Sequence, residues 1–146
     1  MRKSEGTRTP DPEQVLGYLL ARASDHVGRR WDAALRGHDI NPRQFSVLAW
    51  LAFAPGLSSA ELARRVMITP QSMSEMLATL ESLGLVVRTS ESTPGKAIAL
   101  EITALGRRLL DKAMPLVHQA NEGSFGHLSS RERQTFRTLL LKILAT

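Results

Sequence analysis

The sequence predicts a mainly α protein with one small β-hairpin, an α+β arrangement in which helices precede and follow the hairpin. Helix-start signals recur along the chain, and each is followed by apolar residues at three- and four-residue steps. Two short apolar runs enclose a segment rich in Ser, Thr, Pro and Gly, which is typical of a hairpin. Hydrophobic residues make up 42% of the 146 residues, so the chain can form a sizeable core.

The first predicted helix covers residues 11–37 and follows residues 1–10, which we expect to form a flexible basic arm. Asp11 is a typical N-cap, Pro12 suits the first helical position and Gly37 is a typical helix end. The inward face of this long amphipathic helix carries Leu16, Leu20, Ala23, Val27, Trp31 and Ala34.

A helix-turn-helix is predicted in the middle of the chain. Asn41 starts one helix, and Ser58 with Glu61 forms a capping box that starts the next. Thr69 starts a third helix after the three-residue turn 67–69, which is the spacing of a helix-turn-helix. The apolar stripe of this third helix consists of Met73, Met76, Leu77, Leu80 and Leu83, and Gly84 suits the left-handed position that ends it.

The hairpin comes directly after the helix-turn-helix. Residues 85–87 and 97–102 are rich in β-branched and other apolar side chains, which predicts two short strands. Residues 89–96 form the loop between them. A strand pair in this position converts the helix-turn-helix into a winged helix-turn-helix.

Two more helices follow the hairpin. Thr103 is positioned to cap the first of them, and Pro115 inside it predicts a kink or a split. Ser129 and Glu132 form a capping box that starts the last helix. The residues expected to point inward from that helix are Phe136, Leu139, Leu140, Ile143 and Leu144.

The charge balance favours a polyanionic partner, nucleic acid above all. Nineteen Lys and Arg exceed fourteen Asp and Glu, which gives a net charge of +5. The chain has no Cys, which excludes disulfides, thiolate metal sites and a cysteine nucleophile. No apolar run approaches the roughly 20 residues that a membrane span requires, and the first residues lack the apolar stretch of a signal peptide. We therefore expect a cytoplasmic protein without a membrane partner.

The sequence contains no motif that indicates catalysis. A Gly-x-Ser-x-Gly elbow, a Walker loop, a dinucleotide-binding Gly-x-Gly-x-x-Gly and a metalloprotease motif are all missing. The histidines lack paired ligand spacing, so scattered surface histidines explain them better than metal sensing does. They are His26, His38, His118 and His127. We expect no enzyme activity, no catalytic residues, no metal site and no cofactor.

Three stretches of the sequence, residues 40–52, 58–88 and 98–110, resemble the MarR family of transcription regulators. The middle stretch is the most specific, because its apolar spacing and its dipeptides fall in register with the family. These dipeptides are Leu62-Ala63, Leu80-Glu81 and Gly84-Leu85. The resemblance extends roughly from the first predicted helix to the last.

The resemblance implies a homodimer that binds double-stranded DNA, represses transcription and is released by a small aromatic or phenolic effector. It implies a helical dimerisation lobe from residues 11–37 and 104–146, and a DNA-binding lobe from residues 38–103. The wide apolar stripes of the terminal helices agree with a dimer, although packing on their own lobe is the alternative. A symmetric dimer predicts a pseudo-palindromic operator with half-sites about one helical turn apart.

The predicted DNA contacts lie on the helix after Thr69 and on the segments beside it. Gln71 is suited to adenine, Glu75 to the N4 amino group of cytosine, and the flanking cations to phosphates. The alternative is that these side chains form only a solvated surface. The predicted DNA-binding residues are Arg43, Arg64, Arg65, Thr69, Gln71, Ser72, Ser74, Glu75, Thr79, Arg88 and Lys96.

The predicted recognition helix and wing depart from the family pattern in their charge. Relatives often carry Arg where this chain has Glu75 and Thr79. Relatives also commonly place Asp-Arg-Arg where the wing here has Pro94, Gly95 and Lys96, and Lys suits a narrow minor groove less well than Arg. These departures support a second hypothesis, a winged-helix protein-interaction module that has lost specific DNA binding.

The two tryptophans are the candidates for an effector pocket. Trp31 and Trp50 lie on the first two predicted helices, near the junction of the two lobes. They are predicted as walls of a pocket for an aromatic effector, and their alternative role is that of core anchors.

Overall fold

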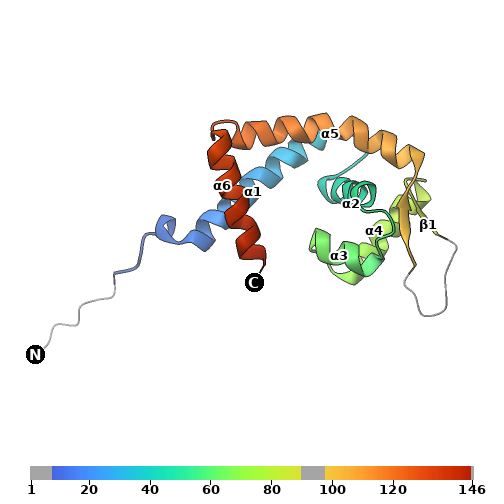
Figure 1. Cartoon of the computed structure of the whole chain (residues 1–146), viewed down its shortest axis with the longest axis horizontal. Helices are drawn as coiled ribbons and strands as arrows, with labels where there is room; N and C mark the ends of the chain where they lie inside the picture. The colour runs from blue at the N-terminus through green and yellow to red at the C-terminus, as the bar shows by residue number, and fades with distance from the viewer. Residues whose placement is uncertain (1–7, 90–97, 146) are drawn as a thin grey trace, which may run out of the picture.

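The computed structural model describes residues 8–89 and 98–145. The elements in chain order are η1 (Pro12–Gln14), α1 (Leu16–Leu35), α2 (Pro42–Phe53), α3 (Ser59–Val66), α4 (Pro70–Ser82), β1 (Val86–Arg88), β2 (Leu100–Ile102), α5 (Ala104–Phe125) and α6 (Ser130–Leu144). Figure 1 shows two groups of elements joined by the long helix α5: α2, α3, α4 and the hairpin lie at one end, and α6 and the first half of α1 lie at the other. The fold is therefore mainly helical with a two-stranded antiparallel sheet, as the sequence predicted.

One hydrophobic core fixes the position of α4 relative to the rest of the molecule. Its fully buried large side chains are Val47, Leu48, Leu51, Leu62, Met73, Leu77, Leu80 and Leu100. They come from α2, α3, α4 and β2, and Leu110 of α5 extends the same cluster. Burying one such side chain contributes about 1.5–3 kcal/mol, so the helix-turn-helix is held as a rigid unit.

Five of the predicted helix starts, those of α2 to α6, are confirmed. Asn41, Ser58 and Ser129 each accept a hydrogen bond from the backbone amide three residues on, and the side chain of that residue accepts one from the backbone amide of the cap. Thr69 and Thr103 cap α4 and α5 in the same position. Each cap is worth about 1 kcal/mol, and together they fix where the helices begin.

The prediction of one helix over residues 11–37 is wrong at its start. Asp11 accepts from the amide of Glu13, two residues on, and this short-range cap starts the single 3₁₀ turn η1. Val15 is then extended (φ −94°, ψ 109°), so the α-helix begins only at Leu16. At the other end, Gly37 takes a positive φ of 81°, as its place at the helix end suggested.

The strands are shorter than predicted. β1 pairs antiparallel with β2 in the register Val86↔Ile102 and Arg88↔Leu100. Leu85 lies outside the strand because its amide donates to Leu80 O at 2.9 Å, which ends α4, and its carbonyl accepts from Thr103 N at 3.0 Å. Most of the predicted wing loop, 90–96, lies outside the described residues, and so does the start of the second predicted strand.

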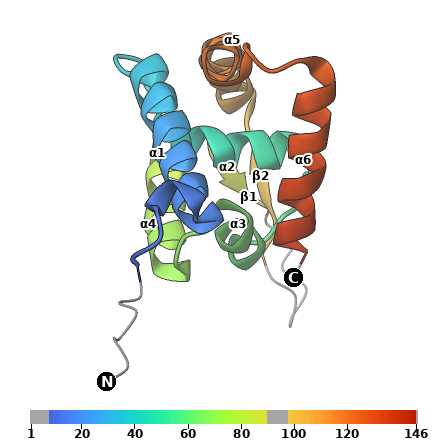
Figure 2. The same ribbon diagram turned by 90° about the vertical axis from the view of Figure 1, so that its left-hand side faces the viewer.

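Helix α5 is continuous through Pro115, so the predicted split is wrong. Pro115 lies on the exposed side of the helix, where water can pair with the carbonyl that the proline leaves without an amide donor. Figure 2 shows α5 nearly end-on, with α1 on one side of the molecule and α6 on the other. None of the helices in residues 8–89 and 98–145 combines the length and apolar character needed to cross a bilayer.

Helix α6 contributes no buried residue to the single chain. Leu139, Ile143 and Leu144, which were expected to point inward, are exposed in the single chain. The helix is attached at its first turns, where the Arg133 guanidinium donates to both carboxylate oxygens of Glu122 at 2.7 and 3.0 Å. Its apolar face is therefore left open along the helix.

We expect the corner between α5 and α6 to loosen in acid. Hydrogen bonds from Arg133, and then its charge, lower the pKa of the Glu122 carboxyl below its ordinary value. A carboxyl whose pKa is lowered in the folded state stabilises the fold above its ordinary pKa, and this contribution is lost as the pH falls through the lowered value. Hydrogen exchange of residues 130–144, followed from pH 7 to acid, checks this. Protection is expressed relative to the intrinsic exchange rate at each pH. On this scale the wild type should lose protection in acid, and Glu122→Gln should be less protected at pH 7 and lose less in acid. Protection like that of the wild type at both pH values would contradict this.

Candidate nucleic-acid interface

The turn between α3 and α4 is closed by local hydrogen bonds. Met67 adopts a left-handed conformation (φ 57°), and Ile68 N donates to Ala63 O at 3.1 Å. Thr69 Oγ1 then accepts from Ser72 N at 3.1 Å and starts α4. A left-handed methionine is uncommon, and its side chain is 82% exposed at the tip of the turn. The turn therefore sets a fixed angle between α3 and α4.

Helix α4 has one buried face and one polar face. Its buried face includes Met73, Leu77 and Leu80, as predicted, with Met76 half-buried. Leu83 was expected in this stripe but is 53% exposed, because the helix has already ended at Ser82. The predicted DNA contacts on α4 are all exposed, and Ala78 is exposed among them: Gln71, Ser72, Ser74, Glu75 and Thr79.

Several polar side chains on this face are oriented by contacts within α4. Gln71 Nε2 lies 3.5 Å from Glu75 Oε1, one helical turn away. Thr69 Oγ1 donates to Ser72 Oγ at 3.0 Å. The Thr79 hydroxyl donates to the Glu75 carbonyl at 3.2 Å, so its hydrogen is directed along the helix rather than outward. Gln71 and Glu75 therefore act as a pair on the exposed face.

Two arginines on α3 lie beside the recognition helix. Arg64 and Arg65 are both exposed, and the guanidinium carbon of Arg65 is 4.4 Å from the centre of the Trp50 ring. A cation over a tryptophan ring is attracted by the ring face, which restrains this long side chain. Hydrogen bonds with Ser58 chiefly lower the pKa of the neighbouring Glu61, and the two arginines add to the effect.

Arg43 belongs to the same surface although it comes from α2. Together with Met67, Ile68, Thr69 and Ser72, it surrounds an open hollow of about 420 Å³. The structure thus brings together the start of α2, the turn and the start of α4. A cation and two hydroxyls around one hollow are suited to an anionic oxygen such as that of a DNA phosphate.

Arg88 is already paired within the chain. Its Nε donates to Glu81 Oε1 at 2.8 Å, so β1 is tied to the end of α4. Glu81 was not predicted as part of the site, and the sequence offers little signal for the pair because the two residues are seven apart on different elements. Lys96, the remaining predicted contact, lies outside the described residues.

The two tryptophans line one hollow between α1 and α2. It measures about 280 Å³ and is surrounded by aromatic and small side chains, namely Trp31, Phe45, Ser46, Ala49, Trp50 and Phe53. Trp31 is also anchored, because its Nε1 donates to Asn121 Oδ1 at 2.9 Å and its ring meets Phe45 edge-on. Phe53 was not predicted here. It is 81% exposed, and its position just before Pro55-Gly56 is the only sequence signal for it.

Comparison with known proteins identifies relatives of this chain. A family model described as "MarR family" matches residues 38–97. The HTH-type transcriptional repressor Rv2887 of Mycobacterium tuberculosis is 35% identical over 128 residues, which are 88% of this chain and 92% of the relative. Rv2887 has been crystallised with DNA (TM-score 0.72, 34% identity, 88% of this chain and 97% of that one) and with salicylic acid (0.72, 35%, 88% and 96%).

A second solved structure resembles the fold more closely. The MarR-family transcriptional regulator of Rhodococcus sp. RHA1 superposes with a TM-score of 0.84 at 27% identity, covering 92% of this chain and 97% of that one. The likeness thus includes the terminal helices as well as the winged helix-turn-helix. The chain belongs to the MarR family of winged helix-turn-helix transcriptional regulators, and it is a regulator rather than an enzyme.

Proposed function

We propose that this protein is a homodimeric, cytoplasmic repressor that binds a pseudo-palindromic duplex operator. The observation that carries the proposal is the two-faced helix α4, whose apolar side is buried and whose polar side is exposed after a closed turn. A helix of this kind can enter the major groove and present hydrogen-bonding groups to base edges. The repressor that it resembles at 35% identity has been crystallised with DNA.

The positive charge for DNA binding comes from the surroundings of α4. The helix itself contains no Lys or Arg, whereas Arg43, Arg64 and Arg65 lie on α2 and α3 beside it. Cations at these places would neutralise phosphates on either side of the groove, and each neutralised phosphate steepens the salt dependence by about 0.9 log units. Binding should therefore depend strongly on backbone contacts and on salt.

The dimer proposal rests on exposed apolar faces at the end of the molecule opposite the hairpin (Figure 1). On α6, Leu139 is 53% and Leu144 is 74% exposed. The first half of α1 adds Leu16, Tyr18, Leu19 and Leu20, all of them exposed. Apolar surface of this extent is typical of a protein interface, and a second copy of the chain supplies the same faces by symmetry.

Placing charges on the apolar face of α6 should separate the dimer. Leu139→Glu with Leu144→Glu would bury two carboxylates in the interface, which is strongly unfavourable. We expect sedimentation to show the mass of one chain and operator affinity to fall about 100-fold or more, because the two half-sites are no longer bound together. Thr138→Glu, on the polar face of α6, is the control and should stay dimeric. A double variant that kept the dimer mass would overturn this interface.

We propose further that a small aromatic acid regulates the protein from the hollow at Trp31 and Trp50. Its volume of about 280 Å³ is close to the lower limit of about 300 Å³ for ligand pockets, which favours a single-ring compound. Its aromatic walls suit such a ring, and the relative Rv2887 has been crystallised with salicylic acid. Because Arg65 packs on Trp50, a ligand that moves this ring would also move an arginine that we propose contacts a DNA phosphate.

A protein-interaction module remains the second candidate function, and one observation favours it. Leu83, Val87 and Leu105 are exposed at the base of the hairpin. An apolar patch beside the wing is more typical of a protein contact than of DNA binding. The two candidate functions predict different results with DNA: the repressor binds a duplex of defined sequence, and the protein-interaction module does not.

The test of the proposed function is a fluorescence-anisotropy titration against the DNA upstream of the protein's own gene. It is run at two salt concentrations, with a scrambled duplex of the same composition as the control. Tighter, salt-sensitive binding to the native duplex, reversed by salicylate, is the expected result. Equal and weak binding to both duplexes would contradict operator recognition there and favour the protein-interaction module.

A further inference from the structure

The recognition helix is negatively charged, which is unusual for an element that enters a groove of DNA. Residues 70–82 contain no Lys or Arg but include Glu75 and Glu81. Arg88 neutralises Glu81 through an ion pair of 2.8 Å. No ion pair within the described part of the chain includes Glu75. The net charge that α4 brings to DNA is therefore that of the Glu75 carboxylate.

Glu75 lies in the middle of the exposed face of α4. The helix runs from Pro70 to Ser82, and the side chain one turn earlier, Gln71, contacts Glu75 Oε1 through its amide nitrogen at 3.5 Å. The amide donates to the Glu75 side chain, and a carboxylate can only accept hydrogen bonds. In a groove lined by phosphates, such a group is unfavourable unless it meets a donor.

The base edges in the major groove offer few donors. Guanine presents the acceptors N7 and O6, and thymine presents the acceptor O4 beside its methyl group. Adenine has the N6 amino donor, but its N7 acceptor lies next to it and would face the second carboxylate oxygen of Glu75. Cytosine presents the N4 amino donor and has no acceptor of its own in the major groove, because the neighbouring acceptor O6 belongs to the paired guanine. It is therefore the base whose own edge suits a carboxylate.

We propose that Glu75 makes cytosine the required base at one position of each operator half-site, by accepting a hydrogen bond from its N4 amino group. The proposal rests on the proposed function and adds the base that it recognises. The carboxylate acts mainly by exclusion: guanine or thymine at that position would place an acceptor against a negative charge.

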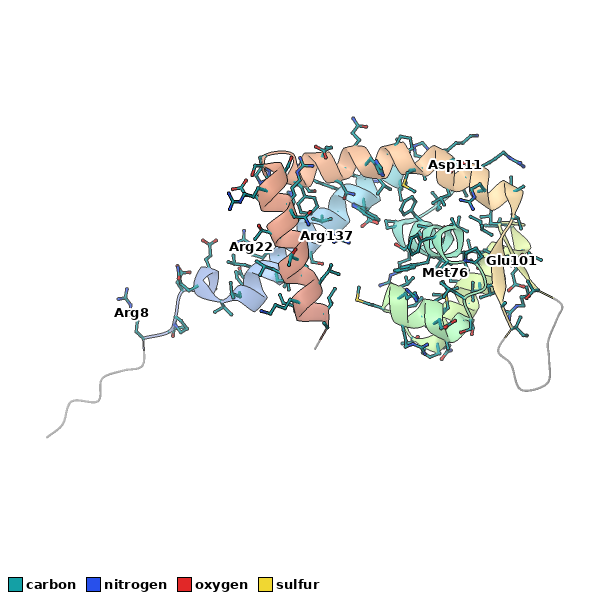
Figure 3. All side chains as sticks on the ribbon, in the orientation of Figure 1. Arg8, Arg22, Met76, Glu101, Asp111 and Arg137 are labelled. Carbon is teal, nitrogen blue, oxygen red and sulfur yellow. The ribbon has the colours of Figure 1, made fainter. Side chains whose placement is uncertain are left out.

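The experiment compares the operators that four forms of the full-length protein select from random duplexes. They are the wild type, Glu75→Ala, Glu75→Gln and Asp111→Asn. The last variant removes one negative charge from an exposed position on α5, which Figure 3 shows well apart from Met76 on α4. It therefore controls for net charge. Affinities are then measured on the selected duplex with each base placed at the cytosine position.

For the wild type, thymine or guanine at that position should weaken binding about tenfold or more. Glu75→Ala should reduce this difference to about threefold or less, Glu75→Gln should tolerate guanine and thymine, and Asp111→Asn should keep the wild-type preference. A duplex with 5-methylcytosine should bind like cytosine, since it keeps the amino donor and carries the methyl group of thymine.

Three results would overturn the inference. One is a wild-type operator without a required cytosine in each half-site. Another is a cytosine preference that Glu75→Ala leaves unchanged, as expected of a carboxylate that stays in solvent. The third is a loss with 5-methylcytosine as large as that with thymine, which would assign the discrimination to the methyl group. If the wild type selects no sequence at all, the proposed function fails together with the inference, whereas these three results leave the proposed function intact.

Discussion

Replacing Gly106 with alanine should lower the free energy of unfolding by about 2–4 kcal/mol, the largest stability effect we expect from a single methyl group. Gly106 lies in the first turn of α5, where a Cβ atom would overlap the carbonyl oxygen of Leu85 and come within 2.8 Å of Ile102 Cγ1. The backbone of Leu85 cannot easily move away, since its carbonyl accepts from Thr103 N at 3.0 Å. The substitution therefore pushes the hairpin away from the first turn of α5.

Urea denaturation at one fixed protein concentration measures this effect, because a dimer makes apparent stability depend on concentration. Gly28→Ala is the matched control: Gly28 lies inside α1, and an added Cβ would meet nothing within 4 Å in the chain. Alanine is the better helix former, so the control should gain about 0.5–1 kcal/mol. Equal stability of Gly106→Ala and wild type would show that the contact between α5 and Leu85 relaxes at little cost.

The features that the sequence predicted best are those determined by neighbouring residues. The capping boxes at Asn41, Ser58 and Ser129 each depend on a side chain and an amide three residues apart, and all three start a helix where predicted. The division of α4 into a buried and an exposed face follows from helical periodicity. The polar surface of the recognition helix was therefore available from the sequence.

The features that the sequence did not predict depend on contacts between distant elements. The pair between Arg88 and Glu81 joins a strand to a helix, and the contact of Arg65 with Trp50 joins α3 to α2. The sequence left the partner of the apolar face of α6 undecided for a different reason. Periodicity shows that a face is apolar, but it does not show whether the same chain or a second chain covers it. The predicted DNA contacts that the structure describes, all of them except Lys96, are thus exposed as expected, while their role in binding DNA stays a prediction.

Removing both arginines of α3 should have the largest effect on DNA binding. A dimer carries two copies each of Arg64 and Arg65, so Arg64→Ala with Arg65→Ala removes four candidate phosphate contacts. At about 0.9 log units for each contact, the slope of log affinity against log salt should become shallower by about 3.6. If the two proteins bind alike at 1 M salt, this corresponds at 0.1 M salt to a loss of about 3.6 log units in affinity. Anisotropy titrations of the selected operator across a range of salt concentrations measure both quantities.

The matched control is Arg107→Ala with Arg108→Ala, which removes an adjacent pair of exposed arginines from α5 and lowers the net charge equally. If only the total charge attracted DNA, both double variants would lose affinity alike. If α3 contacts phosphates, the α5 variant should keep nearly the whole slope and the α3 variant should not.

Trp50→Phe tests whether the Trp50 ring orients Arg65. The variant keeps an aromatic ring at this position, but phenylalanine attracts the Arg65 guanidinium more weakly than tryptophan does. If Trp50→Phe lowers operator affinity less than the α3 double variant does, and leaves the salt slope at the wild-type value, then Trp50 positions Arg65 without contributing charge. If the α3 double variant showed the same salt slope as the wild type, the proposal that Arg64 and Arg65 contact phosphates would be wrong.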